Sequence, residues 1–192
     1  MNDLNRYLHA QACNNAWSNL RLLRACAALD DTEFAAPRTG FFPSLKGTLN
    51  HIVTVDWLYV DALERAVAGR PVNADAARFF EPPEPFATCA ELAPAQHEVD
   101  RRLMTLCAEL RDLSCIVAIQ RADHVQKEPI VRVLAHLFQH QIHHRGQAHA
   151  MLASTAVKPP QLDELFLSEE APLRAEELAT LGLHEEDIWP AR

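Results

Sequence analysis

Apolar residues recur at every third or fourth position over four long stretches of the chain, which is the spacing of one face of an α-helix. This pattern predicts helices at about residues 4–29, 45–68, 89–113 and 129–154. Ser44 suits the N-cap of the second helix, and Pro129 suits the first turn of the fourth. Four long helices predict an all-α fold, a four-helix bundle of the kind that builds metal sites between facing helices.

The segments that join these stretches predict a long crossover and a short C-terminal extension. Residues 69–88 are rich in proline and link the second helix to the third, whereas residues 114–129 alternate weakly, as in a hairpin or an extended connector. We divide the chain into a bundle of residues 1–160 and an acidic extension of residues 161–192, with one or two short helices packed on the bundle. The expected anchors of the extension are Phe166, Leu173, Leu178 and Trp189.

Composition and charge narrow the class of protein. The 192 residues are 48% hydrophobic and 23% charged, values typical of one globular domain. With a net charge of −8, the chain does not offer the basic surface that binds nucleic acid or an anionic membrane. We see no secretory signal and no membrane span, so we expect a cytoplasmic protein. The cysteines fit reduced thiols, with the first two as core residues: Cys13, Cys26, Cys89, Cys107 and Cys115.

The fourth predicted helix carries the candidate chemistry. His140 and His144 continue an apolar stripe that includes Val133, Leu137 and Ala148. Two imidazoles four residues apart on one helical face can bind one metal ion. The alternative is a pair of hydrogen-bonded core histidines. The same helix places His136 and His143 on its flank, as rim residues, and His149 on the outward side.

A third ligand has to come from another helix. His51, within the second helix, lies on a secondary apolar row, so the pattern permits burial between helices without requiring it. His97 and His124 are weaker candidates, and His9 and His184, near the termini, are expected to face solvent.

A carboxylate also falls on an apolar helical face. Asp56 lies at the centre of the apolar face of the second helix, where an unpaired charge is costly. It could orient a ligand imidazole or act as a general base, which makes it a weak catalytic candidate. We favour the plainer interpretation, in which Asp56 pairs with a buried Arg, Trp or Tyr group or is exposed despite the helical pattern, because pairing is the commoner fate of a buried carboxylate.

Two stretches resemble a known family. "FPSLKGTLNHIVTVDWLYVDAL" and, about ninety residues later, "LAHLFQHQIHHRGQAHAML" are similar to sequences of the DinB/YfiT-like family of bacterial metalloenzymes. The resemblance implies a four-helix bundle, a homodimer, and a divalent metal held by His51, His140 and His144. Arg145, Gly146 and Gln147 belong to the matching string without an implied ligand role. A glycine within a helix costs about 1 kcal/mol relative to alanine, so we expect Gly146 to pack closely against another helix or a dimer partner.

Three neutral histidines leave a coordination position open, as in catalytic rather than structural zinc sites. All-histidine ligation suits Zn, Ni, Cu or Fe, and the type of ligand does not separate them; we expect Zn or Ni, with Fe, Cu or Mn as alternatives. The resemblance favours thiol-dependent transferase or isomerase chemistry on a small-molecule substrate, with a low-molecular-weight thiol as partner. The alternatives are a metal-assisted hydrolase that uses a bound hydroxide, and a non-catalytic dimeric stress-response or binding protein.

Overall fold

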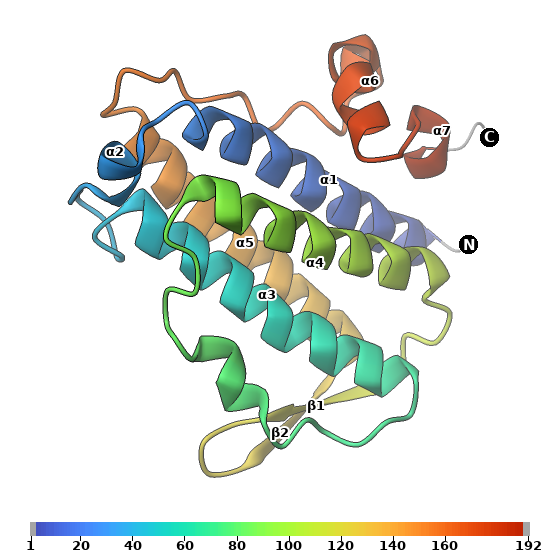
Figure 1. The fold of residues 1–192 in the computed structure, drawn as a ribbon. Coiled ribbons are helices and arrows are strands. Elements are labelled where there is room, and N and C mark those ends of the chain that lie inside the picture. The colour runs from blue at the N-terminus through green and yellow to red at the C-terminus, as the bar shows by residue number, and fades with distance from the viewer. Residues whose placement is uncertain (1–2, 190–192) are drawn as a thin grey trace.

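The computed structural model describes residues 3–189 and is mostly helical (Figure 1). Four long helices pack side by side: α1 (Asp3–Cys26), α3 (Leu45–Val67), α4 (Cys89–Glu109) and α5 (Ile130–Leu152). Both α1 and α3 contact α4 on one side and α5 on the other. Each long helix therefore buries its apolar face against two neighbours.

The ends of these helices follow local capping chemistry. The Ser44 hydroxyl accepts a hydrogen bond from the backbone N–H of Gly47, so α3 begins at Leu45 as predicted. A capping box between Thr88 and Glu91 starts α4. This helix ends at Glu109, before the predicted residue 113. Pro129 is the residue before α5 and not part of its first turn.

The connections are short elements at the ends of the long helices. The brief helix α2 (Asp31–Ala35) precedes α3, and the crossover contains the 3₁₀ helix η1 (Ala76–Phe80). The weakly alternating stretch is an antiparallel hairpin of β1 (Ile116–Gln120) and β2 (Val125–Pro129). The hairpin packs on α3 because Val117 and Ile119 turn inward and are buried. A hairpin was one of the two structures that the sequence predicted there.

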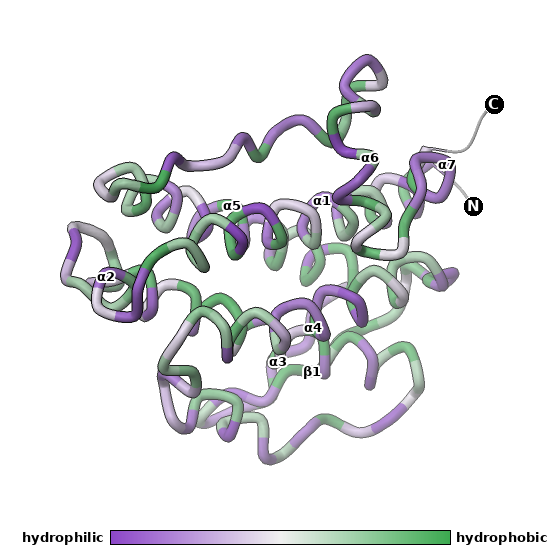
Figure 2. The backbone as a smooth tube through the Cα atoms, turned by 45° about the horizontal axis from the view of Figure 1, so that its top comes forward, coloured by the Kyte–Doolittle hydropathy of each residue, from purple (hydrophilic) through white to green (hydrophobic). Residues whose placement is uncertain are grey.

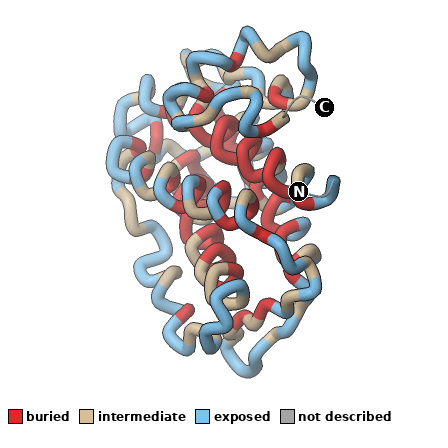
Figure 3. Tube along the Cα trace, turned by 90° about the vertical axis from the view of Figure 1, so that its right-hand side faces the viewer, coloured by how far each residue is buried: buried red, intermediate tan, exposed pale blue. Residues whose placement is uncertain are grey.

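The core holds two apolar clusters with a polar layer between them. Hydrophobic and hydrophilic residues alternate along the long helices (Figure 2). The buried residues concentrate where these helices face one another (Figure 3). The smaller cluster includes Leu22, Leu92 and Leu152, and the larger includes Trp17 and Leu137. The polar layer lies between the clusters along α1, α3, α4 and α5 and consists of seven buried side chains: Asn15, Asn19, Asp56, Gln96, Asp100, Gln141 and Arg145.

The C-terminal extension packs on α1. It contains the 3₁₀ helix η2 (Ser168–Glu170) and the short helices α6 (Ala171–Thr180) and α7 (Glu185–Ile188). Arg21 on α1 forms ion pairs with Glu164 and Glu177, and Trp17 Nε1 donates to Glu177. These contacts join the extension to α1 through charged groups, in addition to the apolar packing of residues such as Leu178.

Three of the four predicted anchors of the extension are correct. Leu178 is buried, and the rings of Phe166 and Trp189 meet with their centroids 6.0 Å apart. Leu173 is 65% exposed, so its predicted anchoring role is wrong. The inward face of α6 is defined by Arg174 and Leu178, four residues apart, and Leu173 lies beside that face. No helix within residues 3–189 is long and apolar enough to cross a membrane.

Candidate metal site

Three histidines from two helices converge at one point. His51 comes from α3, and His140 and His144 come from successive turns of α5. Each imidazole offers one nitrogen, and the three nitrogens lie within 4.8 Å of one another. The Nε2 atoms of His51 and His140 are 3.0 Å apart. The pair predicted from the apolar stripe of α5 and the partner implied by the family resemblance are therefore neighbours in space.

The inward direction of the two α5 histidines follows from their helical positions. Val133, Leu137 and Ala148 on the same stripe are all buried. His144 is buried with them, and His140 is half-buried. Because α3 packs against this face of α5, His51 on α3 meets both imidazoles.

A glutamine one turn along α5 fixes the orientation of His144. The Nδ1 of His144 lies 3.1 Å from Oε1 of Gln147, which can only accept a hydrogen bond. Nδ1 therefore carries the proton, and Nε2 keeps its lone pair for another partner. The amide nitrogen of Gln147 in turn donates to Nε2 of His143. Gln147 was not predicted to have a role, although its three-residue spacing from His144 on a helix is a signal that could have indicated one.

The environment of the cluster keeps its imidazoles neutral. Burial, and then the neighbouring imidazoles, lower the pKa of His140 to about 3 and that of His51 to about 4. Burial also lowers the pKa of His144. Nδ1 of His140 is buried without a hydrogen-bond partner among residues 3–189. Neutral imidazoles are the form that binds a metal cation, and their mutual proximity is costly if they are protonated.

Aromatic rings from the loop before α3 line the cluster. The Phe42 ring lies 4.4 Å from that of His51 and 5.7 Å from that of His144, measured between centroids. Phe41 packs edge-on against Phe42 and is 77% exposed. The adjacent phenylalanines of this proline-containing loop were not assigned a role from the sequence. They give the cluster an apolar border on one side.

The remaining histidines lie outside the cluster. His136 and His143 are exposed on α5, as predicted for rim residues. His149 lies on the other side of the helix, but it is half-buried because its Nε2 donates to the Pro160 carbonyl. The helical pattern placed His149 on the outward side but did not indicate that the chain near Pro160 covers it.

Three further histidine predictions are correct and one is wrong. His97 and His124, the weaker candidates, do not join the cluster, and His184 is exposed as predicted. The expectation that His9 faces solvent is wrong, since it is only 7% exposed and lies 3.5 Å from the sulfur of Cys13. Although His9 is near the N-terminus, α4 and the extension cover that end of α1.

Asp56 belongs to the polar layer and not to the histidine cluster. It accepts hydrogen bonds from Gln96, at 2.8 Å, and from Gln141. Burial, and then the nearby Asp100, raise its pKa well above the usual range. No histidine within residues 3–189 is hydrogen-bonded to it. Asp56 is therefore buried and paired, as the favoured interpretation allows, but its hydrogen-bond partners are two glutamines and not the expected Arg, Trp or Tyr.

The expectation that Gly146 packs closely is not met within the chain. Gly146 is exposed, and a Cβ atom built on it would meet nothing within 4 Å. The side of α5 that carries it faces open space between α5 and the C-terminal segment. Contacts with another helix among residues 3–189 therefore do not offset the free-energy cost of a glycine within α5.

The histidine cluster fits a divalent metal ion. Three neutral nitrogen donors at this separation match the ligand type and number of sites that keep one position open. Within residues 3–189, no carboxylate or thiol completes the group. All four buried cysteines lie in the apolar core, and burial raises the pKa of Cys13, Cys26 and Cys107 to about 12 and that of Cys89 to about 11.

Comparison with known proteins places the chain in a family. No curated protein matches it. A family model matches residues 1–179 and so includes most of the C-terminal extension as well as the four long helices. Since this match covers nearly the whole sequence and the histidine cluster lies within it, the chain belongs to the DinB family.

Proposed function

We propose that this protein is a metal-dependent enzyme that transfers or isomerises a small-molecule substrate with the help of a low-molecular-weight thiol. The observation that carries the proposal is the convergence of His51, His140 and His144, without a fourth protein ligand among the described residues. We assign the four long helices to a four-helix bundle, which supplies such ligands from facing helices. A divalent metal, most plausibly Zn or Ni, would be held by the three histidines.

The residues around the cluster suit the activation of a thiol. A divalent cation supplies the positive charge that favours the thiolate form. The thiolate sulfur would then form a bond to an electrophilic carbon. In a substitution, the bond from that carbon to the leaving group would break and the leaving group would depart with the electron pair. In an addition, the π bond would break and its electron pair would move to the adjacent atom, which takes up a proton. Neutral imidazoles leave the charge of the cation uncompensated, and Phe42 limits the access of water on one side.

The thiol has to come from outside the chain. The pKa values of all four buried cysteines are raised by burial, so these thiols stay protonated near neutral pH. Cys115, on the connector before β1, also has a raised pKa. None of the five is in the histidine cluster. An external thiol therefore fits the site better than a cysteine of the protein.

The experiment combines metal analysis with a thiol-transfer assay on protein purified without a histidine tag. We expect about one divalent metal ion per chain, and conjugation of a bacterial thiol to members of an electrophile panel. His140→Ala removes a ligand and should lose both metal and activity. His136→Ala changes an exposed histidine one turn away on the same helix and serves as the matched control.

Each alternative gives a different result. A metal-loaded protein that transfers no thiol to any electrophile contradicts the proposed chemistry. Activity that needs no thiol and rises through an ionisation near neutral pH indicates the hydrolase. Absence of metal from the untagged protein indicates a non-catalytic binding or stress-response protein.

We also propose that the protein is a homodimer, as the family resemblance implies. Leu4 and Tyr7 on α1 and Ile142 on α5 are large apolar side chains that are each at least 43% exposed. They line one groove between the two helices and could contribute to a subunit interface. Light scattering on the purified protein measures the mass that decides between monomer and dimer.

A further inference from the structure

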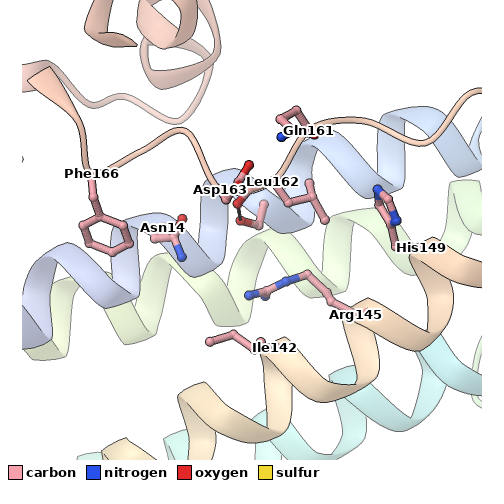
Figure 4. Close-up of a pocket in the computed structure, with 10 residues that line it drawn as sticks. Asn14, Ile142, Arg145, His149, Gln161, Leu162, Asp163 and Phe166 are labelled. Carbon is pink, nitrogen blue, oxygen red and sulfur yellow. Dashed lines mark hydrogen bonds between the residues drawn. The ribbon is translucent and has the colours of Figure 1, made fainter. Parts of the chain in front are cut away.

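A cavity separate from the histidine cluster lies under the C-terminal segment. It has a volume of about 440 Å³ and is bounded by α1, α5 and residues 161–166 (Figure 4). Ile142, Leu162 and Phe166 give it apolar walls. A cavity of this size accommodates a small metabolite. None of the three clustered histidines lines it.

A buried guanidinium borders this cavity with two of its nitrogens unpaired. Arg145 extends from α5 toward α1 and is only 4% exposed (Figure 4). Its Nη1 donates to the side-chain oxygens of Asn15, Asn19 and Gln141. Its Nε and Nη2 have no hydrogen-bond partner among residues 3–189, and no carboxylate there forms an ion pair with it. Asp100 and Asp56 stabilise this cation only at a distance, without a direct ion pair. The unpaired edge of the guanidinium can therefore still accept a direct anionic partner.

The free edge of Arg145 has the shape of a carboxylate-binding fork. The Nε–H and one Nη2–H bond of a guanidinium point in parallel and match the two oxygens of a carboxylate. Burial lowers the pKa of Arg145 to about 10, which still leaves it charged at neutral pH. A bidentate carboxylate would provide the hydrogen bonds that Nε and Nη2 lack, and a direct ion-pair partner in addition to the more distant charges of Asp100 and Asp56.

Other polar groups around the cavity can accept hydrogen bonds, which favours a bound carboxylate that carries a hydrogen-bond donor as well. Oδ1 of Asn14 is buried and has no partner among the described residues. Asp163 is exposed at the rim and adds a negative charge. Ser18 is already engaged, because its hydroxyl donates to the Leu162 carbonyl. A hydroxyl or ammonium group next to the carboxylate could meet Asn14 or Asp163.

We propose that this cavity is a binding site for a small organic carboxylate with an apolar body, held through the Nε–Nη2 edge of Arg145. The ligand fills the space between Ile142 and Phe166 and stands apart from the candidate metal. The site is additional to the proposed thiol chemistry and does not depend on it.

The test uses calorimetric titration of the full chain with 4-methylpentanoate and with its neutral analogue, 4-methylpentanamide. A charge-assisted fork contributes about ten- to hundredfold in affinity, so the amide should bind weaker by about that factor. 2-Hydroxy-4-methylpentanoate, which adds a donor, should bind at least as well as the simple acid. Asp163→Asn removes a like charge from the rim and should strengthen binding of 4-methylpentanoate.

A substitution of Arg145 would disturb the core, because Arg145 is part of the buried polar layer. The test therefore uses variants that leave this layer intact. Gly146→Phe places a ring in open space beside the cavity and should abolish binding without unfolding the protein. Ala150→Phe adds the same ring at an exposed position of α5 outside the cavity and should bind normally. His140→Ala should also bind normally, which separates this site from the metal. Equal affinity for acid and amide, normal binding by Gly146→Phe, or loss of binding in His140→Ala would each overturn the proposal.

Discussion

At the scale of single residues, the candidate site depends on which nitrogen of each imidazole is free. Only Gln147 fixes this for His144, because its carbonyl oxygen accepts the Nδ1 proton. Partners of this kind hold a ligand imidazole in place and raise its basicity, and their loss typically lowers metal affinity by ten- to hundredfold. The side chain of Gln147 therefore contributes to the site without touching the metal position.

We predict that Gln147→Leu weakens metal binding by about one order of magnitude or more, without loss of the fold. The leucine is shorter than the glutamine but similar in bulk, and it offers no acceptor, so the His144 ring is free to turn. Competition with a chelator of known affinity measures the change. His143→Ala removes only the far end of the same hydrogen-bond chain and should have a smaller effect. If Gln147→Leu binds metal as tightly as the wild type, then Gln147 does not orient His144.

At this scale the sequence indicates on which side of its helix a residue lies, but not which other segments cover that residue. Steps of three and four residues placed His140 and His144 on the core side of α5 correctly, because that periodicity is local. The burial of His9 and the covering of His149 arise from segments far along the chain. His51 was assigned from the family resemblance, since its own row of apolar residues left its direction open.

At the scale of elements, the long helices were predictable because their signals are local. The apolar period and the Ser44 cap located α3 almost to the residue. The end of α4 was predicted too late, since leucines continue beyond Glu109 into the connector. Three apolar anchors of the extension were predictable, but its charged attachment was not, because that attachment depends on contacts between distant residues such as Arg21 and Glu177.

Arg174 on α6 holds the extension together internally. Its side chain is fully buried, it pairs with Glu185 on α7, and it donates to the carbonyls of Glu164 and Leu167. Removing one partner of such a buried charged network leaves the others unpaired. The extension should therefore depend on Arg174 more than the four long helices do.

We predict that Arg174→Met loosens residues 161–189 while the long helices stay folded. Amide hydrogen exchange should become faster in α6 and α7 and remain slow in α3 and α5. Arg101→Met, which breaks a largely exposed ion pair with Glu98 on α4, should leave the exchange of the extension unchanged. Uniformly faster exchange across the whole chain would show instead that the extension and the long helices unfold as one unit.

At the scale of the whole molecule, the buried polar layer and the histidine cluster give stability opposite dependences on pH. His51 and His140 have lowered pKa values, of about 4 and about 3, so the unfolded chain takes up their protons first as the pH falls below about 6.5. Their contribution to stability is therefore present above that pH and is lost on acidification. Asp100 acts in the other direction, because burial raises its pKa to about 6. Between about pH 6 and pH 4, Asp100 is protonated in the folded chain but largely ionised in the unfolded chain. Acidification over this range therefore increases the contribution of Asp100 to stability.

Substitution separates these two effects. In the metal-free protein, we predict that His140→Leu loses less stability than the wild type between pH 7 and pH 5. The difference is at most about 2 kcal/mol, the limit for one proton taken up only by the unfolded chain over that range. Asp100→Asn should change the slope in the opposite direction, with a greater loss of stability on acidification than in the wild type. Urea unfolding at several pH values measures both slopes. If the three proteins show the same slope, burial does not hold these groups in the protonation states inferred from the structure, and the neutral form of the histidine cluster would need another cause.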